Sequence, residues 1–514
     1  MSKSGLFPLM LVGFLLPAAE MRAQGAVDFD ALHAYLLNHV TASQVTGLAV
    51  GIIKDGNVVF ARGYGVRNRE TRAPVDTQTQ FSLASNTKPF TVAALGLLVD
   101  EGRLRWQDKV ISYLPWFQLS DAYATRELTI GDLLSHRSGL GTFDGDLLWF
   151  GTSYSSEEVV RRIRSLPLRN GFRNQSGYQN VLFIAAGLVV EAVSGMPWHE
   201  FIERRVLRVL GMRHSSTALA ALTADDNHAV PHLDGRPLPF ISYDNVGPAG
   251  GLNSSVGDML IWLNMWLGTG VANNAQLLAP QTVRTITASQ MSLNGGRGAE
   301  PQGVHFLNYG YGWQLSDYAG RKIVRHGGAL PGYLSEVAFV PEEKLGIVVL
   351  INDLVPIHAA IADKILDLFM TSKDRDYVGE TLQAWERSKS VLARRRQERL
   401  DTRVPNTTPS LPVASYAGLY REAMYGDAAV TVVDGRLHLT FRPAPELFSA
   451  SLEHFHFNTF RLQFPAPALE FGLLTFHLGA DGTIDAFTID LPSQDFRFSD
   501  LRFVRQRNPA GPPQ

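Results

Sequence analysis

The chain has 514 residues, of which 45% are hydrophobic and 19% are charged, so it can bury a sizeable core and form two or three domains. Its net charge of −2 and its pI near 6.7 give no electrostatic basis for binding nucleic acid or an anionic membrane surface. The absence of cysteine excludes disulfides, thiolate metal sites and a cysteine nucleophile.

The first residues are typical of a secretory signal peptide. Lys3 supplies a positive charge, and the apolar run from Leu6 to Leu16 is too short for a comfortable transmembrane helix. We therefore expect residues 1–25 to be a signal peptide, with an uncleaved membrane anchor as the alternative. The candidate cleavage sites follow Ala23, Gly25 and Ala26. No later segment is long and apolar enough to span a bilayer, so the sequence predicts a secreted or periplasmic protein.

Five strands are expected in the part of the chain from residue 26 to residue 373. Two β-rich runs, residues 48–53 and 58–63, flank an Asp-Gly turn and predict a hairpin. Three further runs, at residues 322–326, 336–340 and 346–351, predict an antiparallel unit. Together they would form a five-stranded antiparallel sheet, with helices at residues 29–40 and 356–370. The segment between the two groups of strands is largely helical, so the fold class is α+β. A polar stretch at residues 294–302 is expected to be a surface loop.

The first chemical motif is a serine three residues before a lysine, Ser85 and Lys88, at the start of an apolar run. On a helix this spacing places both side chains on one face, close enough for proton transfer. Pro89 is tolerated only in a first turn, so the helix should begin near Ser85, where unpaired N–H groups favour developing negative charge. The motif alone is weak, because Ser-x-x-Lys arises readily by chance.

Two further groups of residues could complete a site. Tyr178 and Asn180 immediately precede a run that is apolar nearly all round and predicts a buried helix beginning at Val181. His326 ends a short strand and is followed by Gly327 and Gly328, which would let a ligand approach the backbone closely. Taken alone, Tyr178 and Asn180 are better explained by a turn with a packed tyrosine.

Other conspicuous residues have simpler interpretations. Ser138 lacks the first glycine of a nucleophile elbow, and His136 is better explained as a packed or capping residue. His454 and His456 could share a strand face, but two histidines without a third ligand rarely form a metal site. We therefore expect no metal and no cofactor.

The composition changes after residue 373. Residues 374–412 contain an arginine-rich charge run with interleaved acidic residues, then a proline-containing stretch, and are interpreted as a linker with a solvated helix. Residues 413–508 alternate β-rich runs with turns and predict a separate all-β domain, a small barrel or sandwich. The sequence leaves open whether this domain gates the cleft or joins copies of the chain into a homo-oligomer.

Taken in order, the three motifs resemble those of the serine β-lactamase and penicillin-binding superfamily, whose members carry a Ser-x-x-Lys element. The closest likeness is to the class C β-lactamase-like branch, in which the second motif contains tyrosine and which includes D-aminopeptidases, carboxypeptidases and esterases. The resemblance covers about residues 29–370 and implies a β-lactamase/transpeptidase-like fold. Further matching phrases lie at residues 134–140, 249–252 and 309–313. The C-terminal domain resembles the lipocalin-like β-domain often appended to such hydrolases.

The resemblance implies a serine hydrolase acting through an acyl-enzyme. Ser85 would attack a carbonyl, while Lys88 and Tyr178 would exchange protons with the nucleophile and leaving group. Both bases have ordinary pKa values near 10, so one pKa must be shifted, and the sequence does not say which. Asn180 would position the substrate's amide or ester. The N–H groups of Ser85 and Ala329 would form the oxyanion hole, beside His326, Gly327 and Gly328.

One departure from the family bears on the substrate. Enzymes that recognise penicillin usually carry Lys-Thr-Gly where this chain has His326, Gly327 and Gly328, and the lysine helps to hold the substrate carboxylate. A histidine is largely neutral at pH 7, so a peptidase or esterase for small or peptide-like substrates is favoured over a strong β-lactamase. The alternative is a non-catalytic or slowly acylated penicillin- or peptide-binding receptor. A metal hydrolase is less favoured, since no His-Glu-x-x-His motif is present.

Overall fold

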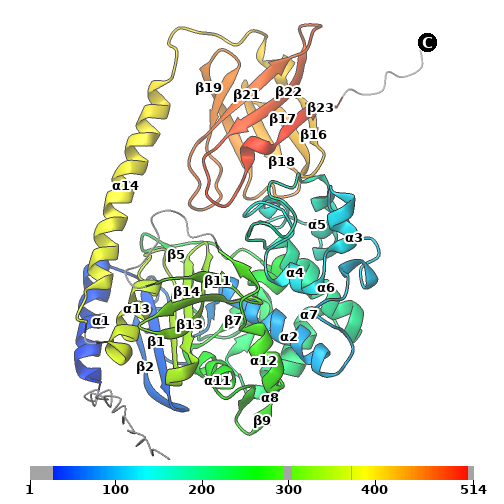
Figure 1. Ribbon diagram of the computed structural model, residues 1–514. Helices are drawn as coiled ribbons and strands as arrows, with labels where there is room; N and C mark the ends of the chain where they lie inside the picture. The colour runs from blue at the N-terminus through cyan, green and yellow to red at the C-terminus, as the bar shows by residue number, and fades with distance from the viewer. Residues whose placement is uncertain (1–26, 294–303, 372, 507–514) are drawn as a thin grey trace, which may run out of the picture.

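The computed structural model describes residues 27–293, 304–371 and 373–506. It shows a mixed α/β body, a long helix that leaves this body, and a β-barrel that lies over the helical half of the body (Figure 1). The predicted signal peptide and the predicted loop at residues 294–302 lie outside the described residues. The fold class is therefore α+β with a separate C-terminal barrel, as the sequence predicted.

The body is built on one antiparallel sheet of eight strands in the order β10-β11-β12-β13-β14-β15-β1-β2. The five expected strands form one continuous block, β13 to β2, which joins the two ends of the body's chain. Three strands that the sequence did not predict extend it beyond β13. The strands are β1 (Gly47–Lys54), β2 (Asn57–Gly65), β10 (Met291–Ser292), β11 (Leu307–Tyr309), β12 (Gln314–Tyr318), β13 (Arg321–Leu330), β14 (Tyr333–Val340) and β15 (Leu345–Ile351).

Register in this sheet is fixed by local turn chemistry and by burial. Between β1 and β2, Asp55 and Gly56 adopt φ values of 51° and 78°, the two positive values that a tight hairpin turn needs. β14 and β15 are buried along their whole length, so each carries an almost unbroken apolar run. In the pairing of β13 with β14, His326 lies opposite Val337 and Gly328 opposite Ser335.

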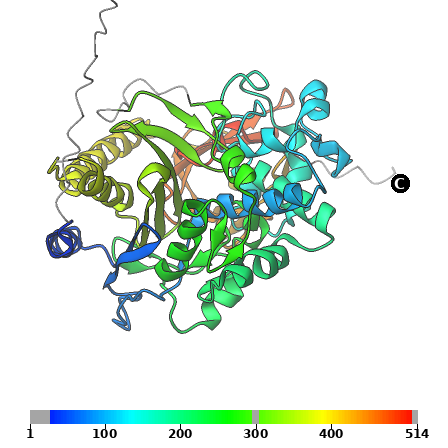
Figure 2. The same ribbon diagram turned by 60° about the horizontal axis from the view of Figure 1, so that its bottom comes forward.

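Helices cover both faces of the sheet (Figures 1 and 2). α1 (Phe29–Ser43) and α13 (His358–Met370) cover one face, where Leu36 and Ile365 are fully buried among strand residues. α11 (Val256–Leu267) covers the other face of the sheet. Because α11 lies between the sheet and the remaining helices, it joins the sheet to the helical half of the body.

The helical half carries the first two motifs. Its helices are α2 (Lys88–Asp100), α3 (Ala122–Glu127), α4 (Ile130–Leu134), α5 (Ser156–Arg162), α6 (Val181–Ser194), α7 (Trp198–Ile202), α8 (Arg208–Leu210), α9 (Leu219–Ala224), α10 (Gly247–Gly250) and α12 (Pro280–Ile286). Its short strands are β3 (Phe81–Ser82), β4 (Ser215–Ser216), β5 (His232–Leu233), β6 (Arg236–Pro237), β7 (Asn253–Ser254), β8 (Val271–Ala272) and β9 (Ala275–Gln276). α2 is almost wholly buried and α6 is buried over most of its length up to Val190, which explains their continuous apolar sequences.

Close packing of α6 depends on Gly187. A Cβ atom at this position would lie 2.2 Å from Pro248 Cγ in α10, a distance that real side chains do not adopt. The glycine therefore lets α10 pack directly against α6. α10 in turn contacts α2, so these three helices form one packed unit beneath the first two motifs.

The C-terminal domain is a closed antiparallel barrel of eight strands. They are β16 (Gly418–Glu422), β17 (Gly426–Val433), β18 (Arg436–Phe441), β19 (Ser449–His456), β20 (Thr459–Leu462), β21 (Gly472–Leu478), β22 (Ile484–Asp490) and β23 (Arg502–Arg505). The barrel is filled with stacked aromatic rings such as Phe441, Phe487 and Phe503. Closure removes the exposed sheet edges that an open sheet of this length would present.

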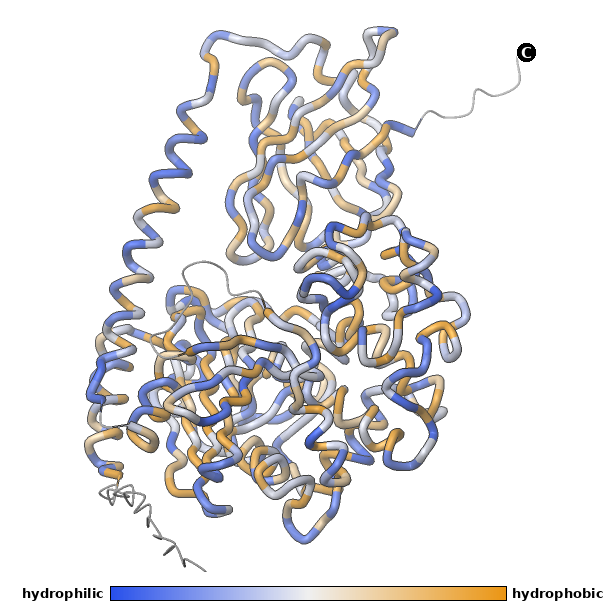
Figure 3. Tube along the Cα trace, viewed as in Figure 1, coloured by the Kyte–Doolittle hydropathy of each residue, from blue (hydrophilic) through white to orange (hydrophobic). Residues whose placement is uncertain are grey.

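The helix α14 (Tyr377–Asp401) occupies most of the segment that the sequence assigned to a linker. It is hydrophilic along most of its length (Figure 3), and Val378 is its one fully buried residue. Its first turns lie against α1 and α13, and its last turn reaches the barrel, where Arg399 donates to the Phe471 carbonyl at 3.0 Å. The exact domain boundaries of the sequence analysis stay a prediction.

Within residues 27–293, 304–371 and 373–506, no single helix has the length and apolar character needed to cross a membrane. α6 and the helical segment from Trp198 to Leu210 meet those criteria only as a pair, and the pair is bent by 74°.

Candidate active site

Ser85 lies in a one-turn 3₁₀ helix, Ala84–Thr87, that runs directly into α2. Ala84 has a φ of 50°, a strained value for a residue with a side chain, and the turn is held from several sides. Ser335 on β14 donates its hydroxyl to the Leu83 carbonyl at 2.7 Å. Pro89 lies in the first turn of α2, so the nucleophile sits at a helix start as the sequence predicted.

Lys88 is fully buried and makes three polar contacts. Its Nζ lies 3.1 Å from Ser85 Oγ, 2.7 Å from Asn180 Oδ1 and 3.0 Å from the Ala249 carbonyl oxygen. Neither Asn180 Oδ1 nor the Ala249 carbonyl can donate, so each must accept one amine hydrogen. A neutral amine has two hydrogens and one lone pair, so its lone pair would then face the Ser85 hydroxyl.

The electrostatic surroundings favour that neutral amine. Burial lowers the pKa of the Lys88 ammonium to about 7 from its ordinary value of 10.5, although the buried carboxylate of Asp146 opposes the shift. Burial raises the pKa of the Tyr178 hydroxyl above its ordinary value, while the Ser85 hydroxyl beside it opposes this change. Lysine is therefore the group whose pKa is shifted towards neutral pH, which answers the question that the sequence left open.

Tyr178 and Asn180 lie just before α6, as predicted, and are held by a neighbouring loop. The Tyr178 ring lies 4.4 Å from the His136 ring, and Lys88 Nζ lies 4.7 Å from the Tyr178 ring centre. Asn180 donates its Nδ2 to Asp146 Oδ2 at 2.6 Å, which leaves its Oδ1 for Lys88. The sequence motifs Ser-x-x-Lys and Tyr-x-Asn are thus joined directly through Lys88 and Asn180.

Asp146 is a site residue that sequence reasoning missed. It is 2% exposed, and burial raises the pKa of its carboxyl to about 7 from its ordinary value of 3.8. It begins a short 3₁₀ helix, Asp146–Leu148, that carries no recognisable motif, and only the fold brings it to Asn180. The Ala249 carbonyl is a second acceptor for Lys88 that the sequence did not reveal, although residues 249–252 match a stretch typical of the family.

His326 borders the site without touching the nucleophile. Its Nε2 lies 2.8 Å from Tyr309 Oη, and its ring centre lies 6.1 Å from that of Tyr178. Burial lowers the pKa of His326 to about 3, and the positive charge of Lys88 adds to this effect, so the imidazole is neutral at pH 7. His136 is packed between aromatic rings and accepts the Gln179 N–H at 3.1 Å, which agrees with its interpretation as a packed residue.

The two glycines after His326 have different surroundings. A Cβ atom at Gly328 would lie 2.4 Å from the Leu83 carbonyl oxygen. The space beside this glycine is therefore taken by the turn that carries Ser85, and not by a ligand. A Cβ atom at Gly327 would instead point towards Glu336, which is paired with Arg325. Gly328 therefore lies against the Ser85 turn, whereas Gly327 faces Glu336. Ala329 follows on β13 and is exposed.

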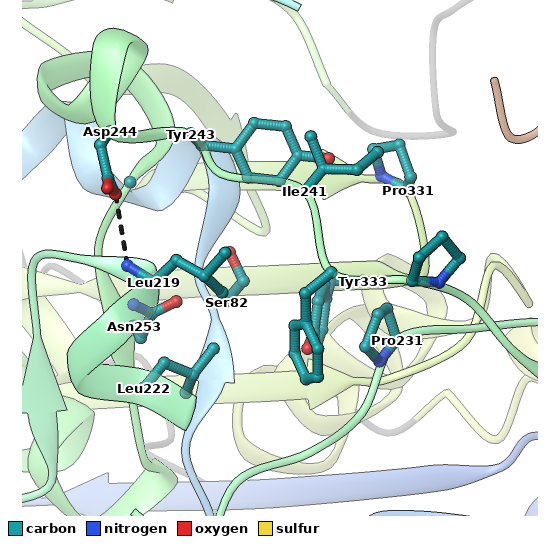
Figure 4. A pocket seen from close by; sticks show the side chains of 13 residues that line it. Ser82, Leu219, Leu222, Pro231, Ile241, Tyr243, Asp244, Asn253, Pro331 and Tyr333 are labelled. Atoms are coloured by element: carbon teal, nitrogen blue, oxygen red, sulfur yellow. Dashed lines mark hydrogen bonds between the residues drawn. The ribbon is translucent and has the colours of Figure 1, made fainter. Parts of the chain in front are cut away.

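A mainly apolar pocket is lined by residues near the nucleophile turn in sequence, but Ser85, Lys88 and Tyr178 are not among its lining residues (Figure 4). Its lining includes Ser82, three residues before Ser85, and Gly251, two residues after Ala249. Asp244 is the one charged residue among the lining residues, and it accepts the Leu219 N–H at 3.2 Å. The other lining residues are Leu219, Leu222, Pro231, Pro239, Phe240, Ile241, Tyr243, Asn253, Pro331 and Tyr333.

In the part of the chain that the structure describes, no group of three or more histidine or acidic side chains is placed to hold a metal ion. His454 and His456, the pair considered from the sequence, each contact a backbone group instead. His454 Nε2 lies 3.0 Å from the Phe457 carbonyl oxygen, and the Val404 N–H donates to His456 Nδ1 at 3.3 Å.

Comparison with known families matches two parts of the chain. The model described as Beta-lactamase matches residues 32–369, and the model described as Domain of unknown function (DUF3471) matches residues 402–505. The first match spans the sheet and the helical half, and the second spans the barrel.

Several relatives carry names of hydrolases or penicillin-binding proteins. The unguisins hydrolase ungD of Aspergillus violaceofuscus is 25% identical over 81% of this chain and 79% of its own length. Penicillin-binding protein 4 of Amycolatopsis lactamdurans is 28% identical over 61% of this chain and 80% of its own length. The putative D-alanyl-D-alanine carboxypeptidase of Escherichia coli is 28% identical over 46% of this chain and 64% of its own length.

Among solved structures, the octameric penicillin-binding protein homologue from Pyrococcus abyssi superposes with a TM-score of 0.60. The superposition covers 93% of this chain and all of that chain, at 22% sequence identity, and it supports the fold alone. With the Ser85–Lys88 pair, the tyrosine motif and a family match over most of the chain in view, this protein belongs to the Beta-lactamase family and is a serine hydrolase with a C-terminal β-barrel.

Proposed function

We propose that this chain is an exported serine hydrolase in which Ser85 forms an acyl-enzyme with amide or ester substrates that are small or peptide-like. The observation that carries the proposal is the 3.1 Å contact between Ser85 Oγ and Lys88 Nζ, in a setting that lowers the pKa of Lys88 to about 7. About half of the lysine is then neutral at pH 7, which makes it an effective general base.

In the first step, the Ser85 hydroxyl gives its proton to neutral Lys88 while its oxygen attacks the carbonyl carbon. The amine keeps its two other hydrogens on Asn180 Oδ1 and the Ala249 carbonyl, so its geometry need not change. The negative charge that develops on the carbonyl oxygen would be stabilised by the N–H groups of Ser85 and Ala329, at the start of the helical turn and on β13.

In the second step, the leaving group must gain a proton as its bond to the carbonyl carbon breaks. Tyr178 is suited to deliver it, because its raised pKa keeps it a phenol at neutral pH. The Tyr178 phenol can then be restored by the proton that Lys88 took from Ser85. Water enters after the leaving group departs and gives a proton to neutral Lys88 as its oxygen attacks the acyl carbon. The bond between the acyl carbon and Ser85 Oγ then breaks, Ser85 Oγ takes that proton back from Lys88, and the acid is released.

The surroundings of the site favour substrates without an obligatory carboxylate. His326 is neutral at pH 7, so it cannot supply the charge that the Lys-Thr-Gly lysine supplies in penicillin-recognising enzymes. The pocket shown in Figure 4 is mainly apolar and carries an acidic residue, Asp244, with no basic one among its lining residues. Both features support a neutral, partly apolar peptide-like or ester substrate over a β-lactam.

The test is intact-protein mass after brief exposure to a fluorophosphonate and, separately, to a penicillin. We expect a fluorophosphonate adduct that is absent from Ser85→Ala, and at most a slow penicillin adduct. A persistent penicillin adduct without turnover of any ester or amide would favour the alternative, a slowly acylated receptor. Absence of any fluorophosphonate adduct in the wild-type protein would refute the proposed nucleophile.

Export and assembly are part of the proposal and have separate tests. The basic and apolar start of the chain supports a signal peptide, and N-terminal sequencing of the protein from a periplasmic or culture fraction should begin near residue 26. The octameric homologue supports homo-oligomerisation, which light scattering of the purified protein would detect as a mass well above 56.6 kDa.

A further inference from the structure

The barrel contributes a segment that packs beside the catalytic loops. This segment, residues 491–501, connects β22 to β23, and its Phe496 packs against Phe150 of the helical half, with ring centres 4.7 Å apart. The next residue, Arg497, reaches across the domain boundary. Its Nε lies 2.7 Å from Asp144 Oδ1, and its Nη2 donates to the Thr142 carbonyl at 3.2 Å.

The loop that Arg497 contacts holds the Tyr178 backbone through both its N–H and its carbonyl group. The Tyr178 N–H donates to Thr142 Oγ1 at 3.2 Å, and the Phe143 N–H donates to the Tyr178 carbonyl at 2.9 Å. Thr142 and Phe143 thus fix where the Tyr178 backbone lies. Arg497 donates to the Thr142 carbonyl, and the Thr142 hydroxyl accepts from the Tyr178 N–H, so only Thr142 separates Arg497 from the catalytic tyrosine.

Asp144 strengthens this arrangement from inside the protein. Its side chain is completely buried, and its Oδ2 accepts the Gly141 N–H at 2.7 Å. Gly141 in turn receives a hydrogen bond at its carbonyl from the side chain of Gln179, the residue between Tyr178 and Asn180. The Asp144 carboxylate therefore fixes the same loop that fixes the Tyr178-Gln179-Asn180 segment.

Two arginines, one from each domain, balance this buried carboxylate. Arg169 of the helical half donates its Nε to Asp144 Oδ1 at 3.0 Å, and Arg497 approaches the same oxygen from the barrel. A buried carboxylate needs such partners, because leaving it unpaired is costly. Only Arg497 also reaches the Thr142 carbonyl, and the rigid fork of a guanidinium suits this double contact.

We propose that Arg497 of the barrel is a positioning residue for Tyr178, so that the docked barrel completes the active site of the same chain. The inference rests on the proposed function, because it assumes that Ser85 is the nucleophile and that Tyr178 moves its proton. Without Arg497, the segment from Gly141 to Asp144 loses its direct hydrogen bond and ion pair to the barrel. The remaining link runs through Arg169, which pairs with both Asp144 and Asp500. The backbone that holds Tyr178 relative to Ser85 and Lys88 is then less firmly fixed.

The test compares the full-length wild-type protein with Arg497→Ala, Arg497→Lys and Tyr154→Phe. The last is a matched control, because the Tyr154 hydroxyl donates to the Tyr425 carbonyl at 2.7 Å across the same boundary without contacting Tyr178. The readout is hydrolysis of an alkyl ester over a range of concentrations, which separates kcat from KM and depends on the proton that Tyr178 supplies to the leaving group. Fluorophosphonate labelling of Ser85, whose fluoride leaves without that proton, is measured in parallel to show that the nucleophile is intact. Thermal melting of each variant reports the docking of the barrel.

We expect Arg497→Ala to lower kcat for the alkyl ester about 10-fold or more, because small displacements of catalytic groups are costly, with little change in KM. Arg497→Lys keeps the positive charge but lacks the two-pronged guanidinium, so its rate should lie between those of the wild type and Arg497→Ala. Tyr154→Phe should lower the melting temperature slightly and leave the rate unchanged. If Arg497 only holds the barrel in place, substitutions at Arg497 and at Tyr154 should both lower the melting temperature, and neither should lower the rate.

The outcomes separate this inference from the proposed function. Failure to label wild-type Ser85 refutes the proposed function itself. Normal labelling of wild-type Ser85 together with alkyl-ester kcat values within two-fold of the wild type for both Arg497 variants overturns the role of Arg497 alone. If Arg497→Ala does not fold, Arg497→Lys decides, because a lower rate at an unchanged melting temperature supports the inference and an unchanged rate refutes it.

Discussion

Asp146 and Asn180 are joined by a 2.6 Å hydrogen bond in which the amide Nδ2 donates to the carboxylate. This bond determines which end of the amide faces Lys88, since Oδ1 is the atom left to accept from Nζ at 2.7 Å. An acidic group outside the three sequence motifs thus sets both the orientation of Asn180 and part of the electrostatic field at Lys88. The predictions below follow from this network.

The reactivity of Ser85 should depend on pH in the way that Lys88 titrates. The neutral amine is the base and its pKa is lowered to about 7, so reactivity should rise with pH and level off above about pH 8. Fluorophosphonate labelling at pH 6 should be about 10-fold slower than at pH 8.5. A rate that keeps rising in proportion to hydroxide up to pH 10 would show that the pKa of Lys88 is unshifted.

Asp146→Asn should move this pH profile to lower pH. The carboxylate raises the pKa of Lys88, and an amide at the same place removes the charge while its oxygen still accepts from Asn180. Labelling at pH 6 should therefore become at least about 2-fold faster relative to the plateau. Because Asp146 and Lys88 both have pKa values near 7, the wild-type profile should also be broader than that of the variant.

Asp146→Ala separates the charge of Asp146 from its hydrogen bond. This variant also removes the charge, but it leaves the buried Asn180 Nδ2 without its acceptor, at a cost of about 1–3 kcal/mol in the free energy of unfolding. Denaturant unfolding should show this loss for Asp146→Ala and little loss for Asp146→Asn. Equal stability of the two variants would contradict the role of the hydrogen bond.

Tyr178→Phe should impair substrates with poor leaving groups most. The Tyr178 phenol is the proposed proton donor to the leaving group, and its raised pKa keeps it protonated. Hydrolysis of an alkyl ester should fall by roughly 10²–10⁴-fold, whereas the p-nitrophenyl ester of the same acid needs little protonation and should be less affected. The ring contact with His136 is retained, so the melting temperature serves as the control. Equal losses for both esters would assign Tyr178 another role.

Gly187→Ala should destabilise the packed unit of α6 and α10. The added Cβ would lie 2.2 Å from Pro248 Cγ, so one helix must move, at a cost of about 1–3 kcal/mol in the free energy of unfolding. The movement should also displace the Ala249 carbonyl from Lys88 and slow the labelling of Ser85. Ala192→Leu on the exposed face of the same helix is the matched control and should change neither quantity.

Features controlled by neighbouring residues were predictable from the sequence. The Asp-Gly hairpin at Asp55 formed because only its two central residues need positive φ values. Thr129 caps α4 through a capping box with Asp132, and Pro89 places the start of α2 just after Ser85. The spacing of Ser85 and Lys88 on one helical turn required no tertiary information either.

Features that depend on distant contacts were not predictable. The strands β10, β11 and β12 are short. β12 pairs with β13, β11 with β12 and β10 with β11, so each depends on a neighbour that is already in place and carries little sequence signal. Gly328 was expected to admit a ligand, but it admits the Leu83 carbonyl, a contact decided by how the turn packs on the strand. The docking of the barrel likewise involves residues hundreds of positions apart, such as Arg497 and Asp144.

The sequence by itself determined the chemistry of this protein: which serine, lysine and tyrosine are available, on which local elements they lie, and that two differently composed domains follow one another. The tertiary structure decided which base has the shifted pKa, because burial depends on every chain segment that surrounds Lys88. It also decided that Asp146, Ala249 and Arg497 belong to the network around the site. The sequence states directly which side chains are present, whereas desolvation and long-range hydrogen bonds arise only once distant segments have packed together.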